Sequence, residues 1–85
     1  MYVLVDSWDA SYLGKASSLN EALSLAKRKS KQISPARVEI YKIPKGKINS
    51  ALGDTLYING THIDDYKNKK LIDVVAWSDY LFGNR

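Results

Sequence analysis

The first apolar run of the chain is Tyr2 to Val5, which Asp6 ends, and it consists of residues that favour strands. It predicts a strand at the start of the chain. Trp8 to Ser11 is typical of a turn. Tyr12 to Ala16 then predicts a short return strand, weakened by Gly14 because glycine has no side chain to pack.

A helix is the clearest prediction, and we place it from Leu19 to Lys31. Ser18 and Glu21 form an S-x-x-E capping box, in which each side chain accepts a hydrogen bond from a free backbone N–H of the first turn. Pro35 prevents the helix from continuing, because the residue before a proline avoids the helical conformation. Within the helix, apolar residues recur at helical spacing, at Leu19, Ala22, Leu23 and Ala26.

A second strand is predicted from Arg37 to Ile43. Val38 and Ile40 alternate with more polar neighbours and would share one face. The opposite face would carry Arg37, Glu39 and Tyr41. A turn over residues 44–47 and a loop over residues 48–53 are expected to follow, because proline and glycine interrupt the pattern.

Residues 55–64 carry a strong hairpin signal, centred on Asn59-Gly60. This pair supplies the two positive φ angles of a type I′ turn. A two-residue loop sets the register, in which directly opposed residues share a face. The pairs are Ile58 with Thr61, Tyr57 with His62 and Leu56 with Ile63. One face then carries Leu56, Ile58, Thr61 and Ile63, and the other carries Tyr57 and His62.

Residues 71–82 permit two interpretations. Leu71, Val74, Val75, Leu81 and Phe82 fit a helical stripe that Gly83 would end. However, residues 71–77 are nearly continuously apolar and rich in strand-forming residues, as in a buried strand. We favour the helix and keep the strand as the alternative.

The order of these elements predicts an α+β fold. One domain over residues 1–85 would pack a small, mostly antiparallel sheet against one or two helices, in the order β-β-α-β-β-β-α. A chain of 85 residues is long enough for one domain with a small core.

Composition excludes several kinds of site and indicates the cellular compartment. The chain has no cysteine, which excludes disulfides, thiolate metal sites and cysteine nucleophiles. Neither a secretory signal nor an apolar run as long as a membrane span is present, so we expect a cytoplasmic protein without membrane contact.

Charge is concentrated in the middle of the chain. The net charge is only +4, yet eight basic residues and a single acid, Glu39, lie between Lys27 and Lys47. Such a block attracts anionic partners. Its phosphate-binding or anion-binding candidates, with Tyr41 as a stacking residue, are Lys27, Arg28, Lys31, Arg37, Tyr41, Lys42, Lys45 and Lys47. One continuous patch would form if the predicted helix and the following strand ended near each other.

Enzyme signatures are missing. The only histidine, His62, lies in the predicted hairpin, where it is expected to be a cross-strand partner of Tyr57 rather than a metal ligand or general base. Asp64 and Asp65 suit a loop or a helix start, and Asp73 and Asp79 suit solvent-facing positions. We therefore expect no catalytic activity, no metal and no cofactor.

Two function classes remain. The first is a nucleic-acid-binding module that holds phosphates through the basic block. The alternative is a protein-interaction or inhibitor module, perhaps encoded by a mobile element, which meets an acidic protein or anchors a partner through Trp8 and Tyr80. A homodimer formed at an open sheet edge is a further alternative. Trp77 and Phe82 are expected in the core.

Overall fold

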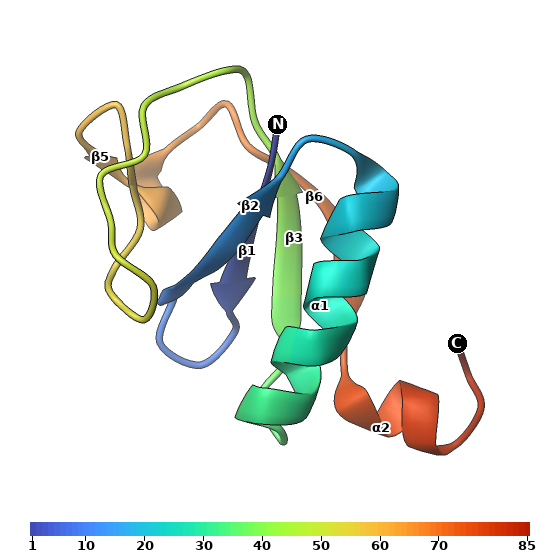
Figure 1. Ribbon diagram of the computed structural model, residues 1–85. Helices are drawn as coiled ribbons and strands as arrows, with labels where there is room; N and C mark the ends of the chain where they lie inside the picture. Colours follow the sequence, from blue (N-terminus) through green and yellow to red (C-terminus); the bar gives the residue numbers. More distant parts are fainter.

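A four-stranded antiparallel sheet forms the centre of the protein in the computed structural model, which describes residues 1–85 (Figure 1). The spatial order of the strands is β2-β1-β3-β6. Their bounds are β1 Tyr2–Asp6, β2 Tyr12–Ala16, β3 Val38–Lys42 and β6 Lys70–Val75. The α+β class and the three strands predicted in the first half of the chain are confirmed.

Helix α1 (Leu19–Ile33) covers one face of the sheet and extends two residues beyond its predicted end. The Ser18 hydroxyl accepts the Glu21 N–H at 3.2 Å, as the capping box requires. The Glu21 carboxylate turns to Ser17 instead of Ser18 and accepts from its N–H and its hydroxyl. Ala22 and Ala26 are fully buried, so the small side chains of the stripe let the helix lie close to the sheet.

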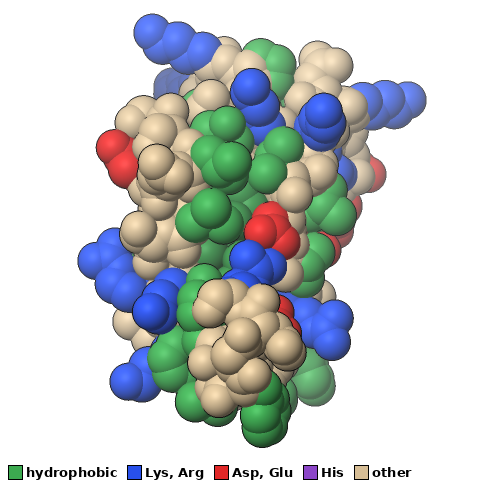
Figure 2. Space-filling view, turned by 90° about the vertical axis from the view of Figure 1, so that its right-hand side faces the viewer, with side chains coloured by type: hydrophobic (Ala, Val, Ile, Leu, Met, Phe, Trp, Pro, Cys, Tyr) green, Lys and Arg blue, Asp and Glu red, His purple; other side chains and the backbone are tan.

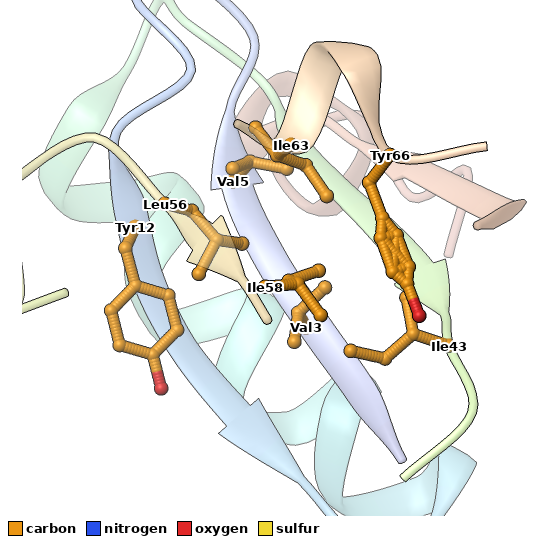
Figure 3. Packing of buried hydrophobic residues seen from close by; sticks show 8 residues of the cluster. All are labelled: Val3, Val5, Tyr12, Ile43, Leu56, Ile58, Ile63 and Tyr66. Carbon is orange, nitrogen blue, oxygen red and sulfur yellow. The ribbon is translucent and has the colours of Figure 1, made fainter. Parts of the chain in front are cut away.

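The opposite face of the sheet is covered by residues 43–69, which contain the hairpin strands β4 (Tyr57–Ile58) and β5 (Thr61–His62) and a short 3-10 turn, η1 (Ile63–Asp65). The predicted register is confirmed, because Tyr57 pairs with His62 and Ile58 with Thr61. Leu56, Ile58 and Ile63 pack onto Val3 and Val5 of β1 (Figure 3). Thr61, at the tip, is exposed. The central strand β1 is therefore buried on both faces, with Val3, Leu4 and Val5 at most 1% exposed.

The helix favoured over residues 71–82 is wrong for the first half of that segment. Lys70–Val75 form β6, which pairs along the free edge of β3, and Val75 is fully buried in the core under α1. Helix α2 spans only Trp77–Leu81. Phe82, expected in the core, is 77% exposed, because the chain turns away from the sheet after α2.

The path of the chain sets the positions of its charged residues. Helix α1 ends at the lower edge of the molecule in Figure 1, and β3 begins there and runs back along the helix to the upper edge. The N-terminus lies at that upper edge, beside the end of β3. Neither α1 nor α2 is long and apolar enough to cross a membrane.

Candidate functional site

The basic residues of the central block are not neutralised by carboxylates. The ion pairs within 4.0 Å join Arg85 to Asp73 and Asp79, and the remaining approach of a basic group to a carboxylate is that of His62 Nδ1 to Asp64 at 3.8 Å. None involves a residue between Lys27 and Lys47, and all but one of the eight basic side chains there are exposed, Lys29 being half-buried. Their positive charge is therefore available to a partner.

The condition under which these residues would form one continuous patch is not met. Because β3 runs back along α1, Lys42 ends at the far edge of the sheet from Lys27 and Lys31. Figure 2 shows the side of the molecule that carries the helices. Its basic side chains lie at the top, at both sides and in the lower part, with hydrophobic surface between them. The block is continuous along the chain and divided in space.

One group of basic residues contacts aromatic rings at the end of α1. The Lys27 ammonium lies 5.0 Å from the ring centroid of Tyr80, and the Lys31 ammonium lies 5.5 Å from that of Trp77. The two rings are 5.7 Å apart and tilted by 35°. We call Lys27, Lys31, Trp77 and Tyr80 the helix-end cluster. Each ammonium is within the distance at which a cation is attracted to a ring face.

The other members of the block lie elsewhere. Lys42 lies 5.9 Å over the Tyr2 ring and pairs with Lys70 across β3 and β6. Lys45 lines a groove with Met1 and Lys15 at the upper edge of the sheet. The backbone of Lys47 is hydrogen-bonded to Asn59 at the hairpin tip. Arg28 lines a groove with Lys15 on the side of α1 away from α2.

Tyr41 and Arg37 do not form the mixed aromatic and basic sheet face expected from the alternation. Tyr41 is half-buried against the layer of residues 43–69, and burial raises the pKa of its phenol. The Lys69 ammonium lies 5.7 Å over its ring while donating to the Ile63 and Asp64 carbonyls. This leaves the ring poorly placed for base stacking. Arg37 lies at the lower edge, where its backbone N–H donates to the Ser7 hydroxyl.

Sequence reasoning missed the role of the residues after β6. Trp77 was assigned to the core, although it is half-buried and supports a lysine of α1. Asp73, assigned to solvent, holds Arg85 through two hydrogen bonds of 2.7 and 2.9 Å. The spacing of Lys27 with Lys31, and of Trp77 with Tyr80, places each pair on one side of its helix. Only the tertiary fold shows that the two pairs face each other.

His62 takes the position expected for a cross-strand residue. Its ring meets that of Tyr57 edge-on at 5.6 Å, and its Nδ1 accepts the Asp64 N–H. No group of three or more histidine, aspartate or glutamate side chains lies close enough together to hold a metal ion. The unpaired basic side chains are thus the main chemical feature of the surface.

Comparison of the chain with protein-family models, with curated proteins and with solved structures found no match. The function is therefore argued from the surface itself.

Proposed function

We propose that the protein is a nucleic-acid-binding module that contacts phosphates through the helix-end cluster. The observation that carries the proposal is the pair of exposed lysines, Lys27 and Lys31, each held over an aromatic ring and neither paired with a carboxylate. The rings restrict the lysine side chains before any partner arrives. That restriction lowers the entropy lost when a phosphate binds.

The proposal concerns phosphate contacts rather than base reading. The faces of Trp77 and Tyr80 that meet the lysines are not free to stack on bases. Lysine acts on phosphate as a point charge and carries no sequence information. Arg28 and Lys29 lie on other sides of the same helix and add only to the general positive potential around the cluster. We therefore expect binding without sequence preference.

Salt dependence follows from this assignment. Three to six phosphate contacts give a slope of log K against log salt of roughly −3 to −5. Fluorescence anisotropy with labelled single-stranded and double-stranded DNA and RNA measures it. Absence of binding to all of them at about 50 mM salt contradicts the proposal.

A matched pair of double variants distinguishes binding at the helix-end cluster from binding driven by the net charge of the protein. Lys27→Gln with Lys31→Gln removes two charges from the helix-end cluster, and Lys45→Gln with Lys47→Gln removes two from the upper edge and the hairpin. The first double variant is expected to reduce the magnitude of the salt slope by about 2 and to weaken binding to every sequence alike. The second is expected to change the slope much less. Equal losses in both would mean that net charge alone drives binding.

An acidic protein surface would also bind with salt dependence, and nuclease treatment distinguishes it. A complex captured from a lysate through Lys27 and Lys31 is expected to disappear when nucleic acid is digested. A protein partner that survives digestion and is lost in the Lys27→Gln, Lys31→Gln variant supports the interaction-module alternative instead.

A further inference from the structure

The turn between β1 and β2 presents an exposed indole on a fixed backbone. Trp8 is 85% exposed. Its backbone N–H donates to Asp6 Oδ1 at 2.8 Å, and the Ser11 backbone N–H donates to Asp9 Oδ1 at 2.9 Å. The turn is also joined to the start of β3, because the Ser7 N–H donates to the Arg37 carbonyl and the Ser7 hydroxyl accepts the Arg37 N–H. The backbone at Trp8 is thus fixed, while its side chain is exposed.

A groove of about 490 Å³ lies beside this indole. Four segments line it: the β1–β2 turn with Trp8, the α1–β3 connection with Pro35 and Arg37, β3 with Glu39, and β6 with Val74. Arg37 is exposed and has no carboxylate within 4.0 Å. Tryptophan and arginine are, with tyrosine, the residue types enriched among the hot spots of protein interfaces.

Charge on this surface is mixed, unlike that of the helix-end cluster. Asp6 and Asp9 flank Trp8, and neither is in an ion pair. Hydrogen bonds from Ser11 lower the pKa of the Asp9 carboxyl, so it is charged at neutral pH. Carboxylates on both sides of the indole repel a phosphate backbone, which argues against nucleic acid here. They attract a cation, and an identical surface on a second molecule supplies one in its own Arg37.

We propose that this surface docks a second copy of the chain about a two-fold axis. Arg37 of each copy would lie over the Trp8 ring of the other, with the Asp6 and Asp9 carboxylates beside the guanidinium. In a two-fold interface every contact occurs twice, so a surface that carries both a free cation and its receptor is self-complementary. Tryptophan is the aromatic residue that attracts a cation most strongly. The apolar surface of Pro35 and Val74 would be buried between the copies.

Sedimentation equilibrium or light scattering across protein concentration tests the proposal. The wild-type chain is expected to dimerise reversibly with a dissociation constant below about 1 mM. A dissociation constant of about 1 mM corresponds to about 4 kcal/mol of binding free energy. Trp8→Ala and Arg37→Glu should each weaken the dimer at least about tenfold, as loss of a central anchor does. Leu52→Ser, which alters a side chain 64% exposed in the 43–69 layer, is the control and should leave dimerisation unchanged.

A wild-type chain that stays monomeric, or a Trp8→Ala or Arg37→Glu chain that dimerises normally, overturns the proposal. Lys27→Gln with Lys31→Gln should dimerise normally, which separates this test from that of nucleic-acid binding.

Discussion

The Arg85 guanidinium binds two residues of the edge strand β6, Asp73 and Val74. Replacing Arg85 by glutamine measures how much these contacts add to the free energy of unfolding. Its two terminal nitrogens donate to the Asp73 carboxylate at 2.9 and 2.7 Å, and one of them also donates to the Val74 carbonyl at 3.1 Å. The Arg85 and Asp73 side chains are 25% and 32% exposed. Hydrogen bonds to charged groups stabilise by roughly 1.5–3 kcal/mol. Partial exposure of the pair to solvent, and the entropy lost in fixing a long side chain, reduce the expected stabilisation to about 1 kcal/mol.

The expected effect of Arg85→Gln depends on pH. Hydrogen bonds from Arg85 hold the pKa of the Asp73 carboxyl below its ordinary value of 3.8. A carboxyl with a lowered pKa in the folded state stabilises that state above its ordinary pKa. The stabilisation is lost as pH falls through the lowered pKa. Arg85→Gln should therefore cost about 1 kcal/mol at pH 7 and much less at about pH 2.

Urea denaturation of both proteins at several pH values measures this difference. Other carboxyls with shifted pKa values, such as Asp9, are present in both proteins and cancel on subtraction. Arg85→Lys is the control: it keeps the charge but not the forked geometry, so it should lie between the two. A difference that stays constant from pH 7 to about pH 2 would refute the reasoning, because Arg85 would then act through packing alone.

Three further changes test other parts of the structure. Ile58→Ala should lower the free energy of unfolding by about 2–5 kcal/mol in urea denaturation, because Ile58 is fully buried where the hairpin meets the sheet. A loss below about 1 kcal/mol would show that this layer packs loosely. Gly14→Ala should lower the stability of the fold by about 1–3 kcal/mol, because Gly14 has a φ of +148° and a Cβ there would lie 2.7 Å from Leu25 Cδ2. An unchanged melting temperature in thermal unfolding would contradict this. Trp77→Leu should weaken oligonucleotide binding about two- to fivefold in anisotropy with no change in charge, and unaltered affinity would mean that the ring does not hold Lys31 in place.

The parts of the fold that sequence predicted are those specified by local chemistry. The hairpin register follows from Asn59-Gly60, because a two-residue turn leaves one pairing that puts Leu56, Ile58 and Ile63 on the same face. The start of α1 follows from Ser18, whose hydroxyl satisfies a backbone N–H of the first turn. Neither signal depends on the rest of the chain, which is why both predictions are confirmed.

Residues 71–82 failed because their local signals conflict. A helical stripe and a strand run overlap there, and the choice depends on a distant element. Strand β3 pairs with β1 along one edge and would otherwise leave its other edge unpaired. Backbone hydrogen bonding along that edge favours β6, and a register shift opposite Ile40 and Tyr41 accommodates the extra residue.

The candidate site was harder to predict than the fold, because charge that is contiguous in sequence was assumed to be contiguous in space. A strand of five residues extends about 17 Å, so Lys42 is carried well away from the residues before β3. The sheet face expected to bind is covered by residues 43–69, whose packing depends on many nonlocal contacts. The aromatic partners of Lys27 and Lys31 come from a helix some 50 residues later in the chain.

The two proposed surfaces have a joint consequence. Both the β1–β2 turn and the end of α1 lie toward the lower edge of the molecule in Figure 1, and the end of α1 carries two lysines, Lys27 and Lys31, that no carboxylate pairs with. A dimer through Trp8 would present two helix-end clusters on one particle. A long oligonucleotide that reaches both helix-end clusters would then bind more tightly, because its second contact is made within the same complex at a high effective concentration. A short oligonucleotide, which reaches only one cluster, would gain nothing. Trp8→Ala should thus weaken binding of a 40-nucleotide strand by about tenfold or more while leaving an 8-nucleotide strand unaffected. If both lengths lose affinity equally, Trp8 itself contacts nucleic acid; if neither does, the two surfaces act independently.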